Sequence, residues 1–268
     1  MSDGIGNTNL KVLVYDTDFY ALMAANSYLA WDRRTRVTHL SETLDEMWAY
    51  LDDLPYAELP DVILFDADHI RSPDYLAENI RRLCQRMPDV VILCTAPQFE
   101  QLGQSGTQIV TAAADAGARG FLVKQEMRLQ LAWAIVFAVD QDFVVTKSVK
   151  KLTEDHYDRR IFEAAVLPPQ RQYPELTDRI RQALALTVVE GMPAHLAAHE
   201  MGISLHTVRG YVKEGYRIME SHDQTDYPVD MTPQERAFMR FTAFEDWLED
   251  ELYGTNPDEQ PHVDNPDA

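Results

Sequence analysis

The chain has 268 residues, 46% of them hydrophobic, which is enough for two domains with separate cores. The longest apolar run, residues 131–139, is far below the ~20 residues of a membrane span, and no signal peptide is recognised, so we expect a cytoplasmic protein without membrane contact. The net charge of −20 excludes a protein that binds nucleic acid non-specifically through an overall positive charge.

The negative charge is concentrated at the end of the chain. Residues 223–268 contain thirteen acidic and two basic residues, which gives −11 of the total −20. The preceding residues are only mildly acidic, so a local DNA-binding face is compatible with the composition. The two cysteines, Cys84 and Cys94, have no metal-ligand spacing and are expected to be ordinary core residues.

The first half of the chain alternates short apolar runs with amphipathic stretches. We expect helices to separate and follow the runs, one of them with Ser72 as its N-cap and Pro73 at its first position. The expected strands are 11–16, 36–40, 61–66, 89–96 and 119–124. Because such runs are apolar on both faces, they predict an α/β domain with a doubly wound, five-stranded parallel sheet.

Polar residues end four of these runs, namely Asp16, Asp66, Thr95 and Lys124. The carboxyl ends of parallel strands gather at one edge of a sheet, so these side chains are expected to converge. An aspartate that accepts a phosphoryl group needs a divalent cation, a hydroxyl and an ammonium group nearby. We therefore interpret Asp66 as the phosphoacceptor, with Mg²⁺ held by Asp16, Asp66 and Asp18.

The segments DVILFDAD, VVILCTA and GARGFLVK resemble the acceptor, switch-threonine and lysine strands of bacterial response-regulator receiver domains. The resemblance spans roughly residues 10–140 and implies a receiver-like domain over 1–140. It implies that Thr95, Lys124 and the aromatic Phe121 form the switch, and that a sensor histidine kinase is a partner. The first strand ends in Tyr15-Asp16, where the family usually has two adjacent acids, so a receiver-like domain that never takes a phosphate is equally consistent.

Residues 174–222 have a helical pattern and predict an all-α domain. An apolar stripe precedes Gly191, and Gly202 then separates a short helix from a longer one that Ser204 is expected to cap. This order of elements is typical of a helix-turn-helix. A recognition helix uses exposed side chains near its N-terminus to contact bases and phosphates. The candidates are Ser204, His206, Thr207, Arg209, Tyr211 and Lys213.

The segment GISLHTVRGYV resembles the recognition unit of LuxR-type, or NarL/FixJ-like, helix-turn-helix domains. The resemblance implies a two-component response regulator that binds double-stranded DNA as a homodimer. Its receiver-like domain is then expected to control dimerisation or DNA binding. A helical bundle used for protein contacts would show the same pattern.

The remaining segments connect or extend these two domains. Residues 141–173 are expected to form a partly helical linker. Residues 223–268 are expected to contain an amphipathic helix that begins with a capping box at Thr232 and Glu235, followed by an acidic, disordered tail from 254. The apolar stripe of this helix, which runs from Phe238 to Leu252, must pack on the same chain or on a second copy.

Two other functions fit parts of the sequence. The run VILFDADHI also resembles the nucleophile segment of haloacid-dehalogenase-like phosphatases, with Asp68 as the general acid. Against this enzyme, its nucleophile normally ends the first strand, and no clear acid pair follows Lys124. A protein-interaction adaptor that uses the C-terminal helix is the third hypothesis. We expect a regulator without enzymatic activity.

Overall fold

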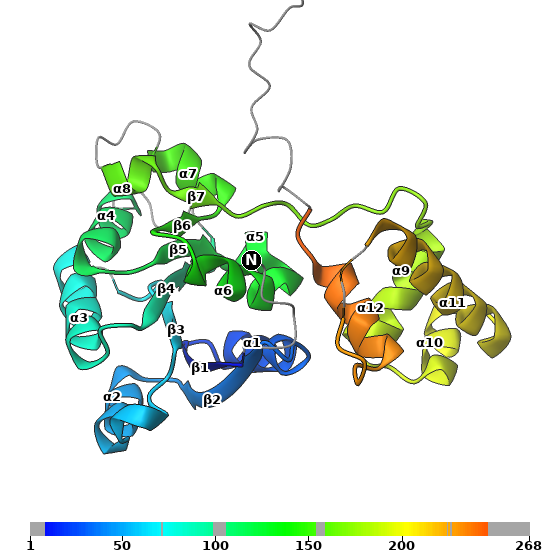
Figure 1. Ribbon diagram of the computed structural model, residues 1–268, viewed down its shortest axis with the longest axis horizontal. Coiled ribbons are helices and arrows are strands. Elements are labelled where there is room, and N and C mark those ends of the chain that lie inside the picture. The colour runs from blue at the N-terminus through cyan, green and yellow to red at the C-terminus, as the bar shows by residue number, and fades with distance from the viewer. Residues whose placement is uncertain are drawn as a thin grey trace, which may run out of the picture.

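The computed structural model describes residues 9–70, 72–98, 106–153, 159–223, 225 and 227–245. Its centre is a sheet in which all seven strands run parallel in the order β2-β1-β3-β4-β5-β6-β7 (Figure 1). The strands are β1 (Leu10–Tyr15), β2 (Thr35–Ser41), β3 (Val62–Asp66), β4 (Val91–Ala96), β5 (Gly120–Val123), β6 (Val144–Val145) and β7 (Ala165–Val166).

The predicted parallel α/β fold is confirmed, but the predicted number of five strands is wrong. Both additional strands, β6 and β7, belong to residues 141–173, which the sequence indicated as a linker. Each strand has only two residues, and a run of that length has no periodicity that could be recognised in a sequence. The sheet therefore extends two strands beyond β5, and the chain leaves it only after Val166.

Helices cover both faces of the sheet, as a doubly wound fold requires. The helices of this part are α1 (Phe19–Ala30), α2 (Leu44–Asp53), α3 (Pro73–Arg86), α4 (Gly106–Ala116), α5 (Lys124–Met127), α6 (Leu131–Val139), α7 (Lys147–Thr153) and α8 (Arg159–Phe162), with 3-10 turns η1 (Tyr56–Glu58) and η3 (Arg128–Gln130). The expected cap of α3 is confirmed: the Ser72 side chain accepts a hydrogen bond from the backbone N–H of Tyr75, and Pro73 is the first helical residue.

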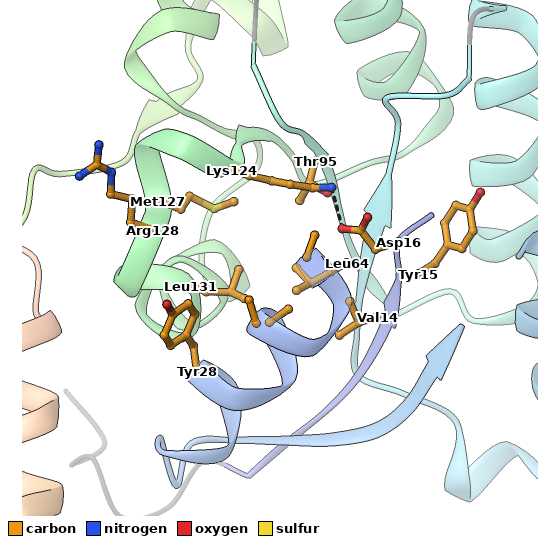
Figure 2. Close-up of a pocket in the computed structure, with 13 residues that line it drawn as sticks. Val14, Tyr15, Asp16, Tyr28, Leu64, Thr95, Lys124, Met127, Arg128 and Leu131 are labelled. Carbon is orange, nitrogen blue, oxygen red and sulfur yellow. Dashed lines mark hydrogen bonds and ion pairs between the residues drawn. The ribbon is translucent and has the colours of Figure 1, made fainter. Parts of the chain in front are cut away.

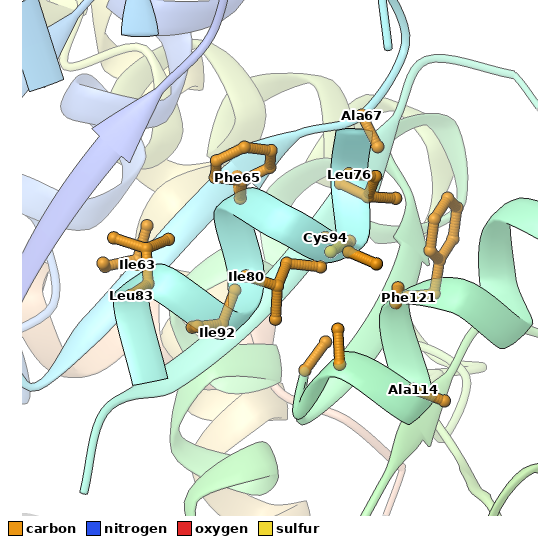
Figure 3. Packing of buried hydrophobic residues seen from close by; sticks show 14 of the residues in the cluster. Ile63, Phe65, Ala67, Leu76, Ile80, Leu83, Ile92, Cys94, Ala114 and Phe121 are labelled. Atoms are coloured by element: carbon orange, nitrogen blue, oxygen red, sulfur yellow. The ribbon is translucent and has the colours of Figure 1, made fainter. Parts of the chain in front are cut away.

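Two apolar layers enclose the sheet. One layer packs α2, α3 and α4 against strand residues such as Phe65, Cys94 and Phe121. Figure 3 shows the part of this layer that α3 and α4 form with the strands. The other layer packs α1 and α6 against the opposite side chains of the same strands, such as Leu64 and Leu93. Cys94 is fully buried, in agreement with its prediction as a core residue.

The second half of the described chain is helical. It contains α9 (Asp178–Leu184), the π-helical turn η4 (Ala185–Val189), α10 (Ala194–Met201), α11 (Leu205–His222) and α12 (Pro233–Thr242). Among the helices that the structure describes, none is both long and apolar enough to cross a membrane.

Helix α12 lies between the sheet and helices α9–α11 (Figure 1). Its capping box at Thr232 and Glu235 is as predicted, but the helix ends at Thr242 because Ala243 is extended. Phe238 is 1% exposed and belongs to a core shared with α9 and α11. The described part of the predicted apolar stripe therefore packs on its own chain. The remainder, including Leu248, Leu252 and the acidic tail, lies outside the described residues.

Candidate functional site

The four predicted strand-end residues converge at one edge of the sheet. Lys124 Nζ donates to Asp16 Oδ2 at 2.6 Å and to Asp66 Oδ1 at 2.9 Å, so one ammonium group joins two carboxylates. Thr95 lies beside Asp66 because the two residues pair in register between β4 and β3. Figure 2 shows Lys124, Thr95 and Asp16 close together, with the ion pair dashed. We call Asp16, Asp66 and Lys124 the acid cluster.

Both carboxylate oxygens of Asp66 accept hydrogen bonds. Oδ1 accepts from Lys124, and Oδ2 accepts from Thr17 Oγ1 at 3.0 Å. Asp66 is only 2% exposed, and Thr95 is 4% exposed. Sequence reasoning missed Thr17, although its position one residue past Asp16 placed a hydroxyl group at the same edge of the sheet.

Burial and charge shift the pKa values in the acid cluster. Burial raises the pKa of the Asp16 carboxyl above its ordinary value, although the charge of Lys124 partly offsets this effect. Burial would lower the pKa of Lys124, but the charges of Asp66 and Asp16 outweigh burial and raise it. Burial and the charge of Asp66 raise the pKa of neighbouring Tyr15 to about 12. The cluster contains two carboxylates and one ammonium group. Its net negative charge favours binding of an additional cation.

Asp18 does not join the acid cluster. Its carboxylate caps α1 by accepting from the backbone N–H groups of Tyr20 and Ala21, while its own N–H donates to Asp16 Oδ1. Throughout the described ranges, no group of three or more His, Cys, Asp or Glu side chains could hold a metal ion. The magnesium site at Asp16, Asp66 and Asp18 therefore stays a prediction, and in this structure the carboxylate of Asp18 is engaged by the N-terminus of α1.

Two carboxylates still fit a magnesium ion. Mg²⁺ commonly uses one or two protein carboxylates and completes its shell with water and phosphate oxygens. Asp16 and Asp66 supply such a pair, both at strand ends and both bound to the same ammonium group. These two residues are the ones that would hold the ion.

Phe121 lies on β5, three residues before Lys124, and is fully buried in the layer formed by α3 and α4. Its ring lies beside Cys94, with which it pairs in register (Figure 3). The predicted switch role of Phe121 thus requires movement inside a packed core.

Helices α10 and α11 are joined by a short turn at Gly202. This residue ends α10 with φ of +65°, in the left-handed region that favours glycine. Ser204 caps α11, and its side chain accepts from the backbone N–H of Thr207 at 3.0 Å. The apolar side of the pair contains Met201 and Val208, which lie in one small core with Ala183 of α9. A three-helix unit therefore presents the opposite side of α11 outward.

The candidate DNA contacts differ in exposure. His206, Arg209 and Lys213 are exposed, and Thr207 is half-buried. Tyr211 was predicted to face outward, but it packs partly against both apolar clusters of the helical half. Arg209 and Lys213, four residues apart on one side of α11, line the same cavity of about 410 Å³.

The two glycines inside α11 have different surroundings. A Cβ atom on Gly215 would lie 2.8 Å from Leu184 Cδ1, so this glycine permits close packing of α11 on α9. A Cβ atom on Gly210 would meet nothing within 4 Å. Gly210 lies on the exposed side of α11, next to Arg209.

A buried ion-pair network behind α11 was not found from the sequence. The Asp223 carboxylate accepts from Arg240 Nε at 2.8 Å and from the Tyr227 hydroxyl at 2.8 Å, and it lies 3.3 Å from Arg171 Nη1. Burial would raise the pKa of Asp223, but hydrogen bonds from Thr225, Tyr227 and Arg240 lower it. Arg240 and Arg171 are 17 and 52 residues from Asp223 in the chain, so no local motif marks the ion pairs of this network.

Comparisons with known proteins give structural similarities only. No family model matches the chain, and no curated protein matches it. Similar solved structures include RcsB from Salmonella enterica serovar Typhimurium bound to the promoter rprA (15% identity, TM-score 0.41), with 88% of this chain and 100% of that chain covered.

Two other structures each match about half of the chain. The isolated REC domain of RcsB from the same organism has 18% identity and a TM-score of 0.43, with 54% of this chain and 99% of that chain covered. A LuxR family DNA-binding response regulator from Silicibacter pomeroyi has 23% identity and a TM-score of 0.40, with 52% and 98% covered. Similarity at this level does not assign a function.

Proposed function

We propose that this chain is a DNA-binding transcription regulator. The receiver-like part holds the input site at the acid cluster, and the helix pair α10–α11 is a helix-turn-helix that contacts double-stranded DNA. The observation that carries the input half of the proposal is the ion pair of Lys124 with both Asp16 and Asp66. These three side chains come from strand ends that are 50 or more residues apart in the chain. Two hydroxyl residues, Thr95 and Thr17, lie beside Asp66, and a purely structural salt bridge would not require them.

The output half rests on the exposed side of α11. Arg209 and Lys213 are exposed cations on one face, and the end of the helix that carries them is capped by Ser204. Arg side chains bind guanine edges and phosphates well, and Lys binds phosphates as a point charge. A second copy of the chain would place two such helices on two half-sites of one duplex. The homodimer is therefore part of the proposal.

Asp66 is the proposed phosphoacceptor, with a sensor histidine kinase as donor. A phosphoryl group on Asp66 Oδ2 would displace the hydrogen bond from Thr17 and lie near the Thr95 hydroxyl, and Lys124 would neutralise part of its charge. Bound Mg²⁺ supplies positive charge that offsets the carboxylates and the phosphoryl oxygens. Asp16 and Asp66 would hold the ion, and Lys124 would shift from Asp16 to the new phosphoryl oxygens.

A phosphorylation-independent regulator is the second candidate, and one observation favours it. Lys124 and Thr17 together occupy both oxygens of Asp66, which is 2% exposed, so the resting side chain offers no free oxygen for attack. In this candidate the acid cluster holds the receiver-like part in one conformation, and a signal other than phosphorylation changes that conformation.

One experiment separates the two candidates. The purified protein is incubated with acetyl phosphate and Mg²⁺, and its intact mass is measured beside that of Asp66→Asn. A gain of one phosphoryl group in the wild type alone supports phosphorylation of Asp66. No gain in either protein supports the second candidate. DNA binding by the same samples, measured by gel shift, then tests whether the modification changes the output.

A further inference from the structure

The structure contains a cavity of about 170 Å³ beside the acid cluster, between α1 and α5–α6. Its floor is formed by Val14 of β1 and Leu64 of β3, and its roof by Leu131 of α6. Figure 2 shows these side chains around the cavity, with Asp16, Thr95 and Lys124 at one end. Between its two polar ends the wall is mostly apolar, so water gains few hydrogen bonds in the middle of the cavity.

Three alanines of α1 keep the space open. Ala21, Ala24 and Ala25 all line the cavity. They lie on one side of the helix because Ala24 and Ala25 follow Ala21 by three and four residues. Any larger aliphatic residue at Ala21 or Ala25 would fill much of the space. Ala24 is exposed, so the cavity reaches the protein surface at this residue.

The cavity connects the acid cluster with the helical half of the chain. At its outer end lies Tyr28, whose side chain also packs against the core formed by α9, α11 and α12. The same end is bounded by Arg128, which has φ of +39° and is the only non-glycine residue with positive φ in the described part of the chain. A positive φ is strained for a residue with a side chain, and strained backbone conformations are often found at ligand-binding sites.

The size and charge of the cavity define the molecule that fits. An engineered apolar cavity of about 150 Å³ takes one benzene molecule, so about 170 Å³ accommodates a single ring. Asp16 and Lys124 line the inner end, Asp66 lies behind them on Lys124, and Arg128 is at the outer end. Without bound Mg²⁺, the two carboxylates against one ammonium group at the inner end disfavour an anion and favour a hydrogen-bond donor. We propose that this cavity binds a small single-ring molecule that directs one hydroxyl or amino group at Asp16. The proposal does not depend on DNA binding.

Phenol is a suitable probe, and benzoate is the matched anionic control. Methyl NMR of the full-length protein follows Met127, which lines the cavity, and Met47, which is buried in the opposite layer. Phenol is expected to shift Met127 saturably and to leave Met47 unchanged, with at least tenfold weaker binding of benzoate. A missing Met127 shift, or equal binding of benzoate, would overturn the proposal.

Variants of α1 test the location. Ala25→Leu fills the cavity and should weaken phenol binding at least tenfold, while Ala30→Leu, on the exposed end of the same helix, should not change it. If Ala25→Leu does not fold, Ala21→Leu fills the same space from the preceding turn. Phenol binding that survives in a folded cavity-filling variant would contradict the assignment.

Discussion

Trp31 and Phe238 stack with ring centroids 5.8 Å apart and ring planes within 25° of each other. Trp31 follows α1 of the sheet part, and Phe238 belongs to α12, so the contact joins the two halves of the molecule. Nearby, Arg33 Nη1 lies 2.6 Å from Asp230, and Trp133 Nε1 donates to Thr242 Oγ1 at 3.2 Å. The sheet part and the helical half are therefore packed together through the end of α1, the segment that follows it and α6.

The first prediction concerns Phe238, which is 1% exposed. Phe238→Ala removes a buried ring from a core shared by α9, α11 and α12, and large-to-small changes of this kind cost about 3–5 kcal/mol. Chemical denaturation should show this loss in the free energy of unfolding. Phe162→Ala, at a side chain that is 65% exposed, is the matched control and should cost far less. Equal losses in the two variants would contradict the packing described for α12.

The second prediction concerns Lys124. Lys124→Met leaves the buried carboxylates of Asp16 and Asp66 without their shared cation, and removal of one partner from a buried ion pair costs roughly 3–5 kcal/mol. Denaturation at pH 7 measures the cost, with the exposed Lys147→Met as control. The loss should shrink as the pH falls, because protonation of Asp16 removes the repulsion. A loss that does not depend on pH would count against a charge origin.

The third prediction concerns alkaline pH. Burial and the charge of Asp66 raise the pKa of Tyr15 from 10.0 to about 12 in the folded protein, so the unfolded chain releases its proton first as the pH rises. The stability that protonated Tyr15 contributes is complete below pH 10 and is lost between pH 10 and about 12. Tyr15→Phe has no ionisable group, so it should gain about 2 kcal/mol relative to wild type over this window. Denaturation between pH 9 and pH 12 measures the free energy of unfolding of the two proteins. If the difference between them stays constant over this range, the raised pKa of Tyr15 is refuted.

The fourth prediction compares the glycines of α11. Gly215→Ala forces a Cβ atom to within 2.8 Å of Leu184, and overpacking costs about 1–3 kcal/mol, which exceeds the ~1 kcal/mol helix preference of Ala. Gly210→Ala meets no neighbour and should stabilise the protein by about 0.5–1 kcal/mol. Thermal melting of both variants should therefore show shifts of opposite sign. Shifts of the same sign would mean that Leu184 can move aside.

Much of the fold follows from local patterns that the sequence displays. Apolar runs ending in Asp66, Thr95 and Lys124 predicted the strands and the edge where those side chains meet, because a parallel sheet has only one carboxyl edge. Ser72 and Ser204 predicted two helix starts because a cap is local to its helix.

Other features depend on distant parts of the chain and could not be predicted in this way. The strands β6 and β7 have two residues each, and only their neighbours in the sheet identify them. The carboxylate of Asp18 could serve a metal or a helix end, and the sequence does not decide between these uses. The same holds for Tyr211, whose contacts with two clusters depend on how α9 and α11 pack.

DNA binding by α11 is tested by selection of duplexes from a random-sequence pool with the purified protein, followed by affinity measurements on the enriched sequence. If α11 contacts bases, the selection yields an enriched motif that the wild type binds at least tenfold more tightly than scrambled duplex. Arg209→Gln with Lys213→Gln should lose this preference, and Arg179→Gln on α9, an exposed cation away from α11, should retain it. No enriched motif, or a motif that the double variant binds as well as the wild type, would mean that α11 does not read DNA sequence.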